Sequence, residues 1–299
     1  MSRRALAEHF EGFLRSLRGK RPETRGTYQR ALREFVRWFE KDGAFRFRVQ
    51  DVERYKQHLT RRKKLSDVSV STYLTAVRRF CEFLVSSGVL KHNPARSVEG
   101  NKRPLWHSRA VLGPGEVEQL LATVVRQDER GLRDYAVIRL MLDCALSEIE
   151  IIRANLNDLQ RTEQGDVIAV QGKGRTRKDA IVPIPTEVKQ AIDDYLRVSS
   201  RPTPEQPLFV SAGNRTRGRR MTTRGIRDRV NMYLEQAGIK QGRLREVTPY
   251  SLRHTAAVVM ADRGASADEI RNRMRLGSVA TAMIYVNHNQ RNKELSGSS

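Results

Sequence analysis

The sequence predicts a mainly α-helical protein with one small β-sheet, an α+β fold divided into two domains. The chain has 299 residues, which is enough for two domains of ordinary size. In most segments apolar residues recur every three or four positions, the spacing of an amphipathic helix. Two short apolar runs on either side of a Gly-Lys-Gly turn have the composition of strands instead.

The first domain is expected at residues 1–98 as a compact helical bundle. The apolar spacing predicts helices at about 6–17, 24–42, 49–59 and 69–87. Thr24 is placed to cap the second of these helices, and Gly88 is a stop signal after the last. Residues 99–110 contain proline and a basic stretch and are expected to form a linker.

The second domain, residues 111–299, is expected to combine helices with two strands. Helices are predicted at about 115–125, 132–142, 187–197, 222–236, 251–263 and 268–275. The strands are predicted at 167–170 and 180–182, with Lys173 in the turn between them. Cys81 and Cys144 both fall within helical apolar patterns, so we expect buried thiols and neither a disulfide framework nor a metal site.

The charge of the chain points to a polyanionic partner. Lys and Arg number 56 against 34 Asp and Glu, a formal net charge of +22, of which residues 1–107 carry +14 (25 basic and 11 acidic residues). No apolar run is long enough for a membrane span, and the N-terminus lacks the core of a signal peptide. We therefore expect a cytoplasmic, nucleoid-associated protein that binds nucleic acid. The alternative is a basic protein without such a partner.

Basic side chains gather in a few short segments of the chain. The residues expected to bind DNA are Arg25, Arg30, Arg61, Arg62, Lys63, Lys64, Arg78, Arg175, Arg177, Arg217, Arg219, Arg220, Arg224 and Arg227. Contacts to phosphates are the favoured use, because runs of one sign suit the DNA backbone. A solvated helix face is the alternative for each run.

One C-terminal pattern resembles the signature of tyrosine recombinases, the phage-integrase and Xer-type family. The segment TPYSLRHT is similar to the family's Pro-His-x-Leu-Arg-His-Thr, and ATAMIY, which ends at Tyr285, is similar to its nucleophile segment. Gly264 and Ala265 match the Gly-Ala between these two segments. The matches fall in the family's order and spacing.

Upstream segments extend the resemblance over nearly the whole chain. ALSEIEIIRANLNDL is similar to the family's Gly-Leu-Arg-x-Ser-Glu segment, with Leu146, Glu150 and Asp158 in register. GKGRTRKDAIVPI resembles the hairpin that carries the family's catalytic lysine. PETRGTYQRALREFVRWF and SVSTYLTAVRRFCEFLVSSGVLKHNPA resemble the first and last parts of its helical, SAM-like core-binding domain.

The resemblance implies a site-specific DNA recombinase or integrase, typical of mobile elements. A tyrosine hydroxyl attacks a DNA phosphodiester, forms a 3′-phosphotyrosyl intermediate and releases a 5′-hydroxyl, so neither a cofactor nor a metal is expected. The phenol, with an ordinary pKa of about 10, needs help in losing its proton. Guanidinium groups suit the charge of the transition state, and a lysine can protonate the leaving oxygen. The implied partner is double-stranded DNA with paired half-sites, bound by a dimer or tetramer, with accessory recombination proteins.

The resemblance also assigns roles to individual residues. Tyr285 matches the nucleophile, Arg253 the second catalytic arginine and Lys173 the general acid on the hairpin. Glu150 matches the supporting acidic residue of the site. His254 follows the catalytic arginine, at a position that is usually structural.

Three catalytic positions of the signature are substituted in this chain, so the implied catalytic set is degenerate. The first arginine is replaced by Ser147, and the histidine of Pro-His-x-Leu-Arg by Tyr250. In a register without gaps, the histidine of Leu-Gly-His falls on Leu276, with Arg275 at the glycine; with a two-residue deletion it falls on Ser278. Losing one preorganised donor typically costs ~10²–10³ in rate. A second hypothesis is therefore a pseudo-recombinase that binds DNA without cleaving it. A third is an enzyme that relaxes DNA like a type IB topoisomerase.

Overall fold

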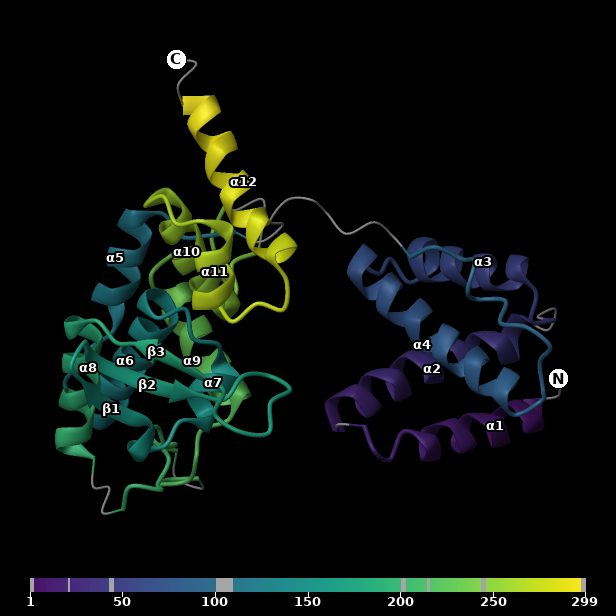
Figure 1. The fold of residues 1–299 in the computed structure, drawn as a ribbon, viewed down its shortest axis with the longest axis horizontal. Helices are drawn as coiled ribbons and strands as arrows, with labels where there is room; N and C mark the ends of the chain where they lie inside the picture. Colours follow the sequence, from purple (N-terminus) through teal and green to yellow (C-terminus); the bar gives the residue numbers. More distant parts are fainter. Residues whose placement is uncertain are drawn as a thin grey trace. The chain divides into compact units, whose positions relative to one another are not determined.

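The computed structural model describes residues 3–20, 22–42, 46–100, 110–199, 203–213, 216–242 and 246–296. The chain divides into two compact units, Met1–Pro104 and Leu105–Ser299 (Figure 1). The linker expected at 99–110 falls largely on residues 101–109, which lie outside the described residues, so the boundaries of the two domains stay a prediction.

The first unit is helical, as predicted. Its elements are α1 (Arg3–Ser16), α2 (Pro22–Asp42), α3 (Val49–Gln57), the π-helical turn η1 (His58–Arg62) and α4 (Asp67–Ser86). Aromatic rings join these helices in the core: Phe13 lies 5.7 Å from Phe80, and Phe35 lies 5.2 Å from Tyr55, between ring centroids. The apolar spacing identified this core because each helix turns its stripe of large side chains inward.

Two helix starts differ from the prediction. α2 begins at Pro22, so Thr24 lies inside the helix and does not cap it. Proline is well suited to the first turn of a helix, where its missing N–H is not needed. α4 begins at Asp67, and the hydroxyl of Ser66 caps it by accepting a hydrogen bond from the Ser69 amide at 3.4 Å.

The second unit packs helices around a small sheet (Figure 1). Its helices are α5 (Pro114–Thr123), α6 (Glu129–Asp143), α7 (Glu148–Arg153), the short 3₁₀ turn η2 (Leu156–Asp158), α8 (Thr186–Val198), α9 (Thr223–Gln236), α10 (Pro249–Asp262), α11 (Ala267–Arg273) and α12 (Val279–Ser296). The predicted α+β class is confirmed. The apolar pattern does not predict α7 or α12, because α7 has only six residues and the apolar residues of α12 run together at its start without helical spacing.

The sheet is antiparallel, in the order β1 (Leu159–Thr162), β2 (Gly165–Val170), β3 (Ala180–Pro183). Ile168 in the central strand pairs with Leu159 on one side and Val182 on the other. β2 and β3 are the two predicted strands, whereas β1 was missed. Leu159 is the only apolar residue of β1, so that strand shows no alternation and is held by its pairing with β2.

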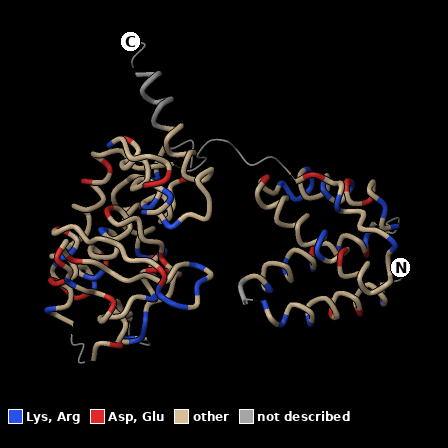
Figure 2. The backbone as a smooth tube through the Cα atoms, in the orientation of Figure 1, with Lys and Arg blue, Asp and Glu red and all other residues tan. Residues whose placement is uncertain are grey.

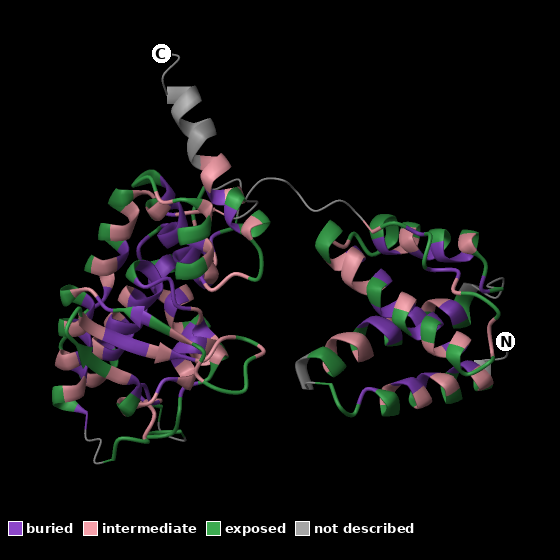
Figure 3. Cartoon of the chain, in the orientation of Figure 1, coloured by how far each residue is buried: buried purple, intermediate pink, exposed green. Residues whose placement is uncertain are grey.

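Two clusters of buried side chains stabilise the second unit (Figure 3). The larger one joins α6, α8 and β2 and includes Ile138, Tyr195 and Ile168. The smaller one joins α10, α11 and α12 and includes Tyr285. Cys81 and Cys144 are free buried thiols, and burial raises the pKa of each to about 12. Within the described residues, no helix combines the length and apolarity needed to cross a membrane.

Candidate active site

Glu150 lies at the centre of a buried cluster at the start of α7. It occupies the third position of the helix, and one of its carboxylate oxygens accepts hydrogen bonds from the amide and the hydroxyl of Ser147, each at 2.7 Å. These two hydrogen bonds from Ser147 to the third residue of the helix hold the start of α7 in place. The side chain of Glu150 is 2% exposed, so a buried carboxylate here needs cationic partners.

Arg253 of α10 is the first of these partners. Its Nη1 donates to Glu150 Oε2 at 2.9 Å and also to the carbonyl of Ala145. Its Nη2 donates to the carbonyl of Met274, just beyond α11. Nε is buried and has no hydrogen-bond partner within the described part of the chain. The guanidinium is thus fixed by the protein on one side and keeps donor capacity on another.

Arg275 is the second cation on the same carboxylate. Its Nε donates to Glu150 Oε1 at 2.5 Å, and its Nη2 donates to Glu150 Oε2 at 3.0 Å and to the carbonyl of Ala145 at 2.8 Å. Burial acts to raise the pKa of Glu150, but the hydrogen bond from Arg275 and the charges of Arg253 and Arg275 outweigh it. The pKa of Glu150 therefore lies below its usual value.

Tyr285 forms a second group of contacts with two residues of α10. The tyrosine is 3% exposed, and its hydroxyl lies 2.6 Å from Nδ1 of His254. The ring of Tyr250 meets the ring of His254 edge to face, with centroids 4.7 Å apart. A phenol can donate a proton to this nitrogen when the imidazole carries its own proton on Nε2.

Lys173 lies in the hairpin loop between β2 and β3, and its side chain is exposed. The loop is anchored on both sides: Arg153 Nη1 donates to the carbonyl of Gly172 at 2.8 Å, and Lys178 Nζ donates to the carboxylate of Asp158 at 2.5 Å. A Cβ built on Gly172 would lie 3.9 Å from Glu150 Oε1. The residue before Lys173 is therefore adjacent to the Glu150 cluster.

The structure brings most of the expected site residues into two touching groups. Ser147, Glu150, Arg253 and Arg275 form one, and Tyr250, His254 and Tyr285 form the other; consecutive residues of α10, Arg253 and His254, join them. Leu276 packs at the edge of the smaller buried cluster and has no side-chain polar group. The carbonyls of Ala145 and Met274 were missed, because a backbone acceptor leaves no signal in the sequence.

Several basic residues expected to bind DNA have protein partners in the first unit. Arg78 donates to the carbonyls of Ala95 at 3.0 Å and Val98 at 2.6 Å, and Lys63 pairs with Glu34 at 2.9 Å. Both residues therefore link segments of the unit, although the Lys63 side chain stays 45% exposed. The other expected residues are exposed, namely Arg25, Arg30, Arg61, Arg62 and Lys64. Lys and Arg are spread over both units (Figure 2).

The basic residues of the second unit divide in the same way. Arg220 donates to the carbonyls of Ile152 at 2.7 Å and Ala154 at 3.0 Å, and Arg227 pairs with Glu148 at 3.0 Å. Arg220 thus connects the segment before α9 to the end of α7, and Arg227 connects α9 to the start of α7. Arg220 and Arg227 are nevertheless exposed. Arg175, Arg177, Arg217, Arg219 and Arg224 are exposed as well, and Arg175 and Arg224 pair with carboxylates of their own segments.

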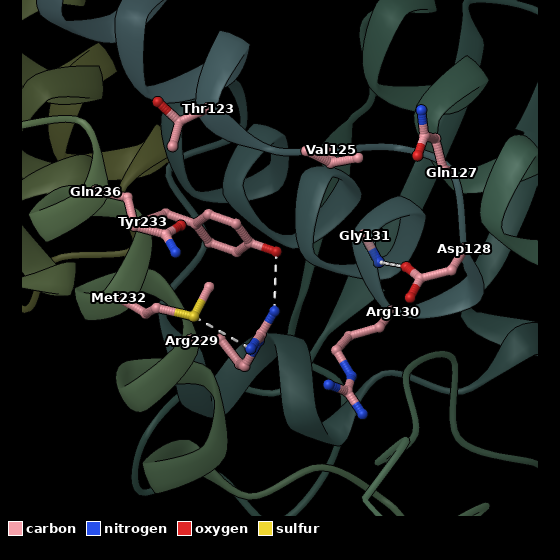
Figure 4. A pocket seen from close by; sticks show the side chains of 10 residues that line it. All are labelled: Thr123, Val125, Gln127, Asp128, Arg130, Gly131, Arg229, Met232, Tyr233 and Gln236. Carbon is pink, nitrogen blue, oxygen red and sulfur yellow. Dashed lines mark hydrogen bonds between the residues drawn. The ribbon is translucent and has the colours of Figure 1, made fainter.

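A separate cavity of about 390 Å³ lies between the α5–α6 connection and α9 (Figure 4). Arg229 in its wall is held by Asp134 at 2.6 Å and by the hydroxyl of Tyr233 at 2.9 Å. None of the residues of the Glu150 or Tyr285 groups lines it. No group of three or more His, Cys, Asp and Glu among the described residues is placed to hold a metal ion.

Both the helical unit and the second unit, which holds the buried arginines and the buried tyrosine, resemble known domains. Two family models match the chain, the phage integrase family over residues 110–292 and the phage integrase N-terminal SAM-like domain over residues 7–88. The chain belongs to the phage integrase family. It is an enzyme of the tyrosine recombinase type, whose chemistry is DNA strand exchange.

Individual relatives agree with this assignment. Tyrosine recombinase XerC of Haemophilus influenzae is 30% identical over 231 residues, covering 77% of this chain and 74% of that protein. Tyrosine recombinase XerD of Lacticaseibacillus casei is 27% identical, covering 94% and 92%. The crystal structure of the XerH recombinase bound to a palindromic difH substrate has the same fold (TM-score 0.75, 16% identity, 95% and 82% covered). So does a λ integrase dimer bound to a core site (TM-score 0.71, 12% identity, 92% and 96% covered).

Proposed function

We propose that this chain is a site-specific recombinase or integrase with an atypical active site, which cleaves DNA through a 3′-phosphotyrosyl intermediate. One observation carries the proposal. Arg253, fixed on Glu150 and on two carbonyls, is followed directly on α10 by His254, which contacts the hydroxyl of Tyr285. A cation for the phosphate and a proton acceptor for the nucleophile thus come from consecutive residues.

The proposed reaction assigns each proton and bond to a named group. Oη of Tyr285 attacks the scissile phosphorus and gives its proton to Nδ1 of His254. The bond from phosphorus to the 5′-oxygen breaks, and Lys173 on the exposed hairpin loop protonates that oxygen. Arg253 neutralises the charge that develops on the phosphate oxygens. Attack of a partner strand's 5′-hydroxyl reverses these transfers and restores Tyr285.

The proposed DNA interface consists of the exposed basic side chains that remain after the structural ones are set aside. They are Arg25, Arg30, Arg61, Arg62 and Lys64 in the first unit, and Arg175, Arg177, Arg217, Arg219 and Arg224 in the second. The λ integrase relative is a dimer on its core site, and the XerH relative binds a palindromic substrate. We propose paired half-sites for this chain as well, with a dimer on each site and a tetramer in strand exchange.

The decisive experiment traps the covalent intermediate. A pool of duplexes with a randomised centre is selected for binding to the full chain, and the selected site is resynthesised with a single nick at each successive position. At the nick next to the scissile bond the released fragment diffuses away, so a covalent complex accumulates on a denaturing gel. Wild-type protein should form this complex, and Tyr285→Phe should bind the duplex equally well and form none. Trapping by Tyr285→Phe would overturn the assignment of the nucleophile.

A second candidate function is a DNA-binding pseudo-recombinase. The substitutions at Ser147, Tyr250 and Leu276, together with the burial of Tyr285, favour it. It predicts that wild-type protein binds the selected site with high affinity and forms no covalent complex at any nick position. That result would replace the first proposal with the second.

A further inference from the structure

The position of the missing first arginine has a short side chain that cannot reach beyond its own helix. Ser147 caps α7, and its hydroxyl donates to Glu150 at 2.7 Å. A serine hydroxyl adds no positive charge to the site. If the chain cleaves DNA as proposed, the charge lost at this position must come from another element.

Arg275 places a guanidinium on the acceptors that surround this position. It contacts both carboxylate oxygens of Glu150, the partner of Ser147, and the carbonyl of Ala145, two residues before Ser147. Arg253 uses the same carboxylate and the same carbonyl. Two guanidinium groups from different elements therefore lie side by side, bridged by one carboxylate.

The backbone at this cluster adopts a conformation that is unfavourable for these residue types. Arg275 has φ 54° and Ala145 has φ 49°, both in the left-handed region, which is unfavourable for a residue with a Cβ. In the resemblance to the recombinase signature, both positions correspond to glycines. Glycine would relieve the cost, so an arginine retained in this conformation points to a use for its side chain.

Other arginines near Ser147 pair with groups other than the Glu150 carboxylate. Arg153, on the same short helix, donates to the carbonyl of Gly172 in the hairpin loop at 2.8 Å. Arg227 pairs with Glu148 and is half-exposed. Among the described residues, Arg253 and Arg275 are the arginines that hydrogen-bond to Glu150.

We propose that Arg275 is a catalytic residue that binds the scissile phosphate beside Arg253 and replaces the first arginine of the family. This inference rests on the proposed function. Of the five N–H groups of each guanidinium, the described contacts use three in Arg253 and four in Arg275. Two arginines and one carboxylate carry a net charge of +1, which complements the single negative charge of a phosphodiester. Nε of Arg253 is buried, so the groups left to meet the phosphate oxygens are one N–H on Nη2 of Arg253 and one on Nη1 of Arg275.

The test removes the arginine from position 275 and restores one at position 147. Arg275→Gly should still fold and bind the selected duplex, because glycine favours the left-handed backbone, and should lower the rate of covalent complex formation by ~10²–10³. The double variant Ser147→Arg/Arg275→Gly should recover at least about tenfold of that loss. Arg273→Ala, which removes an equal charge two residues away, should stay within about threefold of wild type.

A second measurement separates contact with the phosphate from support of Glu150. A selected site with a methylphosphonate at the scissile position lacks one charged oxygen, so an arginine that binds that oxygen loses its advantage. The rate ratio of wild type to Arg275→Gly should shrink by about tenfold or more on this duplex. An unchanged ratio, or wild-type rates in Arg275→Gly on the normal duplex, would overturn the role of Arg275 while leaving the proposed function intact. If wild-type protein forms no covalent complex at all, the proposed function itself fails.

Discussion

At the scale of single residues, Glu150 decides the geometry of the site. It caps α7 through Ser147 and holds Arg253 and Arg275 together, so one carboxylate links three segments of the second unit. Two guanidinium groups this close repel each other, and the buried negative charge between them offsets the repulsion. The lowered pKa of Glu150 has the same cause.

Replacing this carboxylate should cost more stability than any surface ion pair. Glu150→Gln leaves two buried arginines without compensating charge, and we expect a loss of about 3–5 kcal/mol in the free energy of unfolding near neutral pH. Denaturant unfolding followed by circular dichroism measures it. Glu82→Gln, which breaks the exposed pair of Glu82 with Arg79, should cost under about 1 kcal/mol and serves as the matched control.

The stability difference between wild type and Glu150→Gln should also depend on pH. Because the pKa of Glu150 is lowered by folding, its contribution is complete above the unfolded value of about 4.3 and is lost as the pH falls through the lower folded value. The stability difference between wild type and Glu150→Gln should therefore shrink below about pH 4.3. A difference that grows on acidification would contradict this account.

The proposed role of Lys173 as general acid predicts a distinct response to a sulfur leaving group. Lys173→Ala should slow cleavage of the selected site by ~10²–10⁴, the usual contribution of a general acid. A 5′-bridging sulfur at the scissile phosphate leaves as a thiolate and needs no proton, so this substrate should restore most of the rate to Lys173→Ala. Arg253→Ala should gain no comparable rescue, because a sulfur leaving group does not replace a cation. Equal rescue of both variants would remove Lys173 as the acid.

At the scale of elements, short segments without strong apolar patterns position the functional groups. α7 has six residues, and the hairpin loop that carries Lys173 is held by Arg153 and Lys178. Arg78 performs a similar task in the first unit, where it fastens the segment after α4 through the carbonyls of Ala95 and Val98.

Because Arg78 hydrogen-bonds to the backbone of its own unit, we expect its replacement to lower stability and to leave DNA binding unchanged. Arg78→Ala leaves two carbonyls without their donor and should lower the free energy of unfolding by about 1–3 kcal/mol. Arg79→Ala, at the exposed neighbouring position, should change it by less than about 0.5 kcal/mol. Binding isotherms at several salt concentrations should show the same salt slope for Arg78→Ala and wild type. A reduced slope would return Arg78 to the DNA interface.

At the scale of the whole molecule, the net charge of +22 is larger than the active site requires. Some basic side chains bond to other segments of their own unit, namely Lys63, Arg78, Arg220 and Arg227. The exposed remainder is distributed over both units, which is the distribution expected if both contact one DNA backbone.

The salt dependence of DNA affinity measures how many of these exposed basic side chains contact phosphates. The logarithm of DNA affinity should fall linearly with the logarithm of salt concentration, with a slope of about −0.9 for each phosphate neutralised. The triple variant Arg61→Ala/Arg62→Ala/Lys64→Ala should reduce the steepness of this slope by roughly two to three. Lys63→Ala alone should alter it little, since Lys63 pairs with Glu34. An unaltered slope in the triple variant would exclude the η1 segment from the interface.

The sequence predicted the fold well where packing follows periodicity. The helices other than α7 and α12, and the strands β2 and β3, carry regular apolar patterns, and they lie close to their predicted places. The strand β1 and the short α7 were missed because pairing and capping hold them, and neither leaves a periodic signal. The start of α2 was placed two residues late, because Pro22 fits the first turn as well as Thr24 fits a cap.

By itself, the sequence determined the class of the protein, and its resemblance to the family predicts Tyr285 as the nucleophile and three substituted catalytic positions. Motif order and net charge are properties of the chain and need no coordinates. Only the tertiary structure placed Arg275 beside Arg253 on Glu150, and Tyr285 against His254. These pairs are separated by 125, 103 and 31 positions along the chain, and burial of a single carboxylate and a single phenol requires partners that only folding can bring within hydrogen-bond distance.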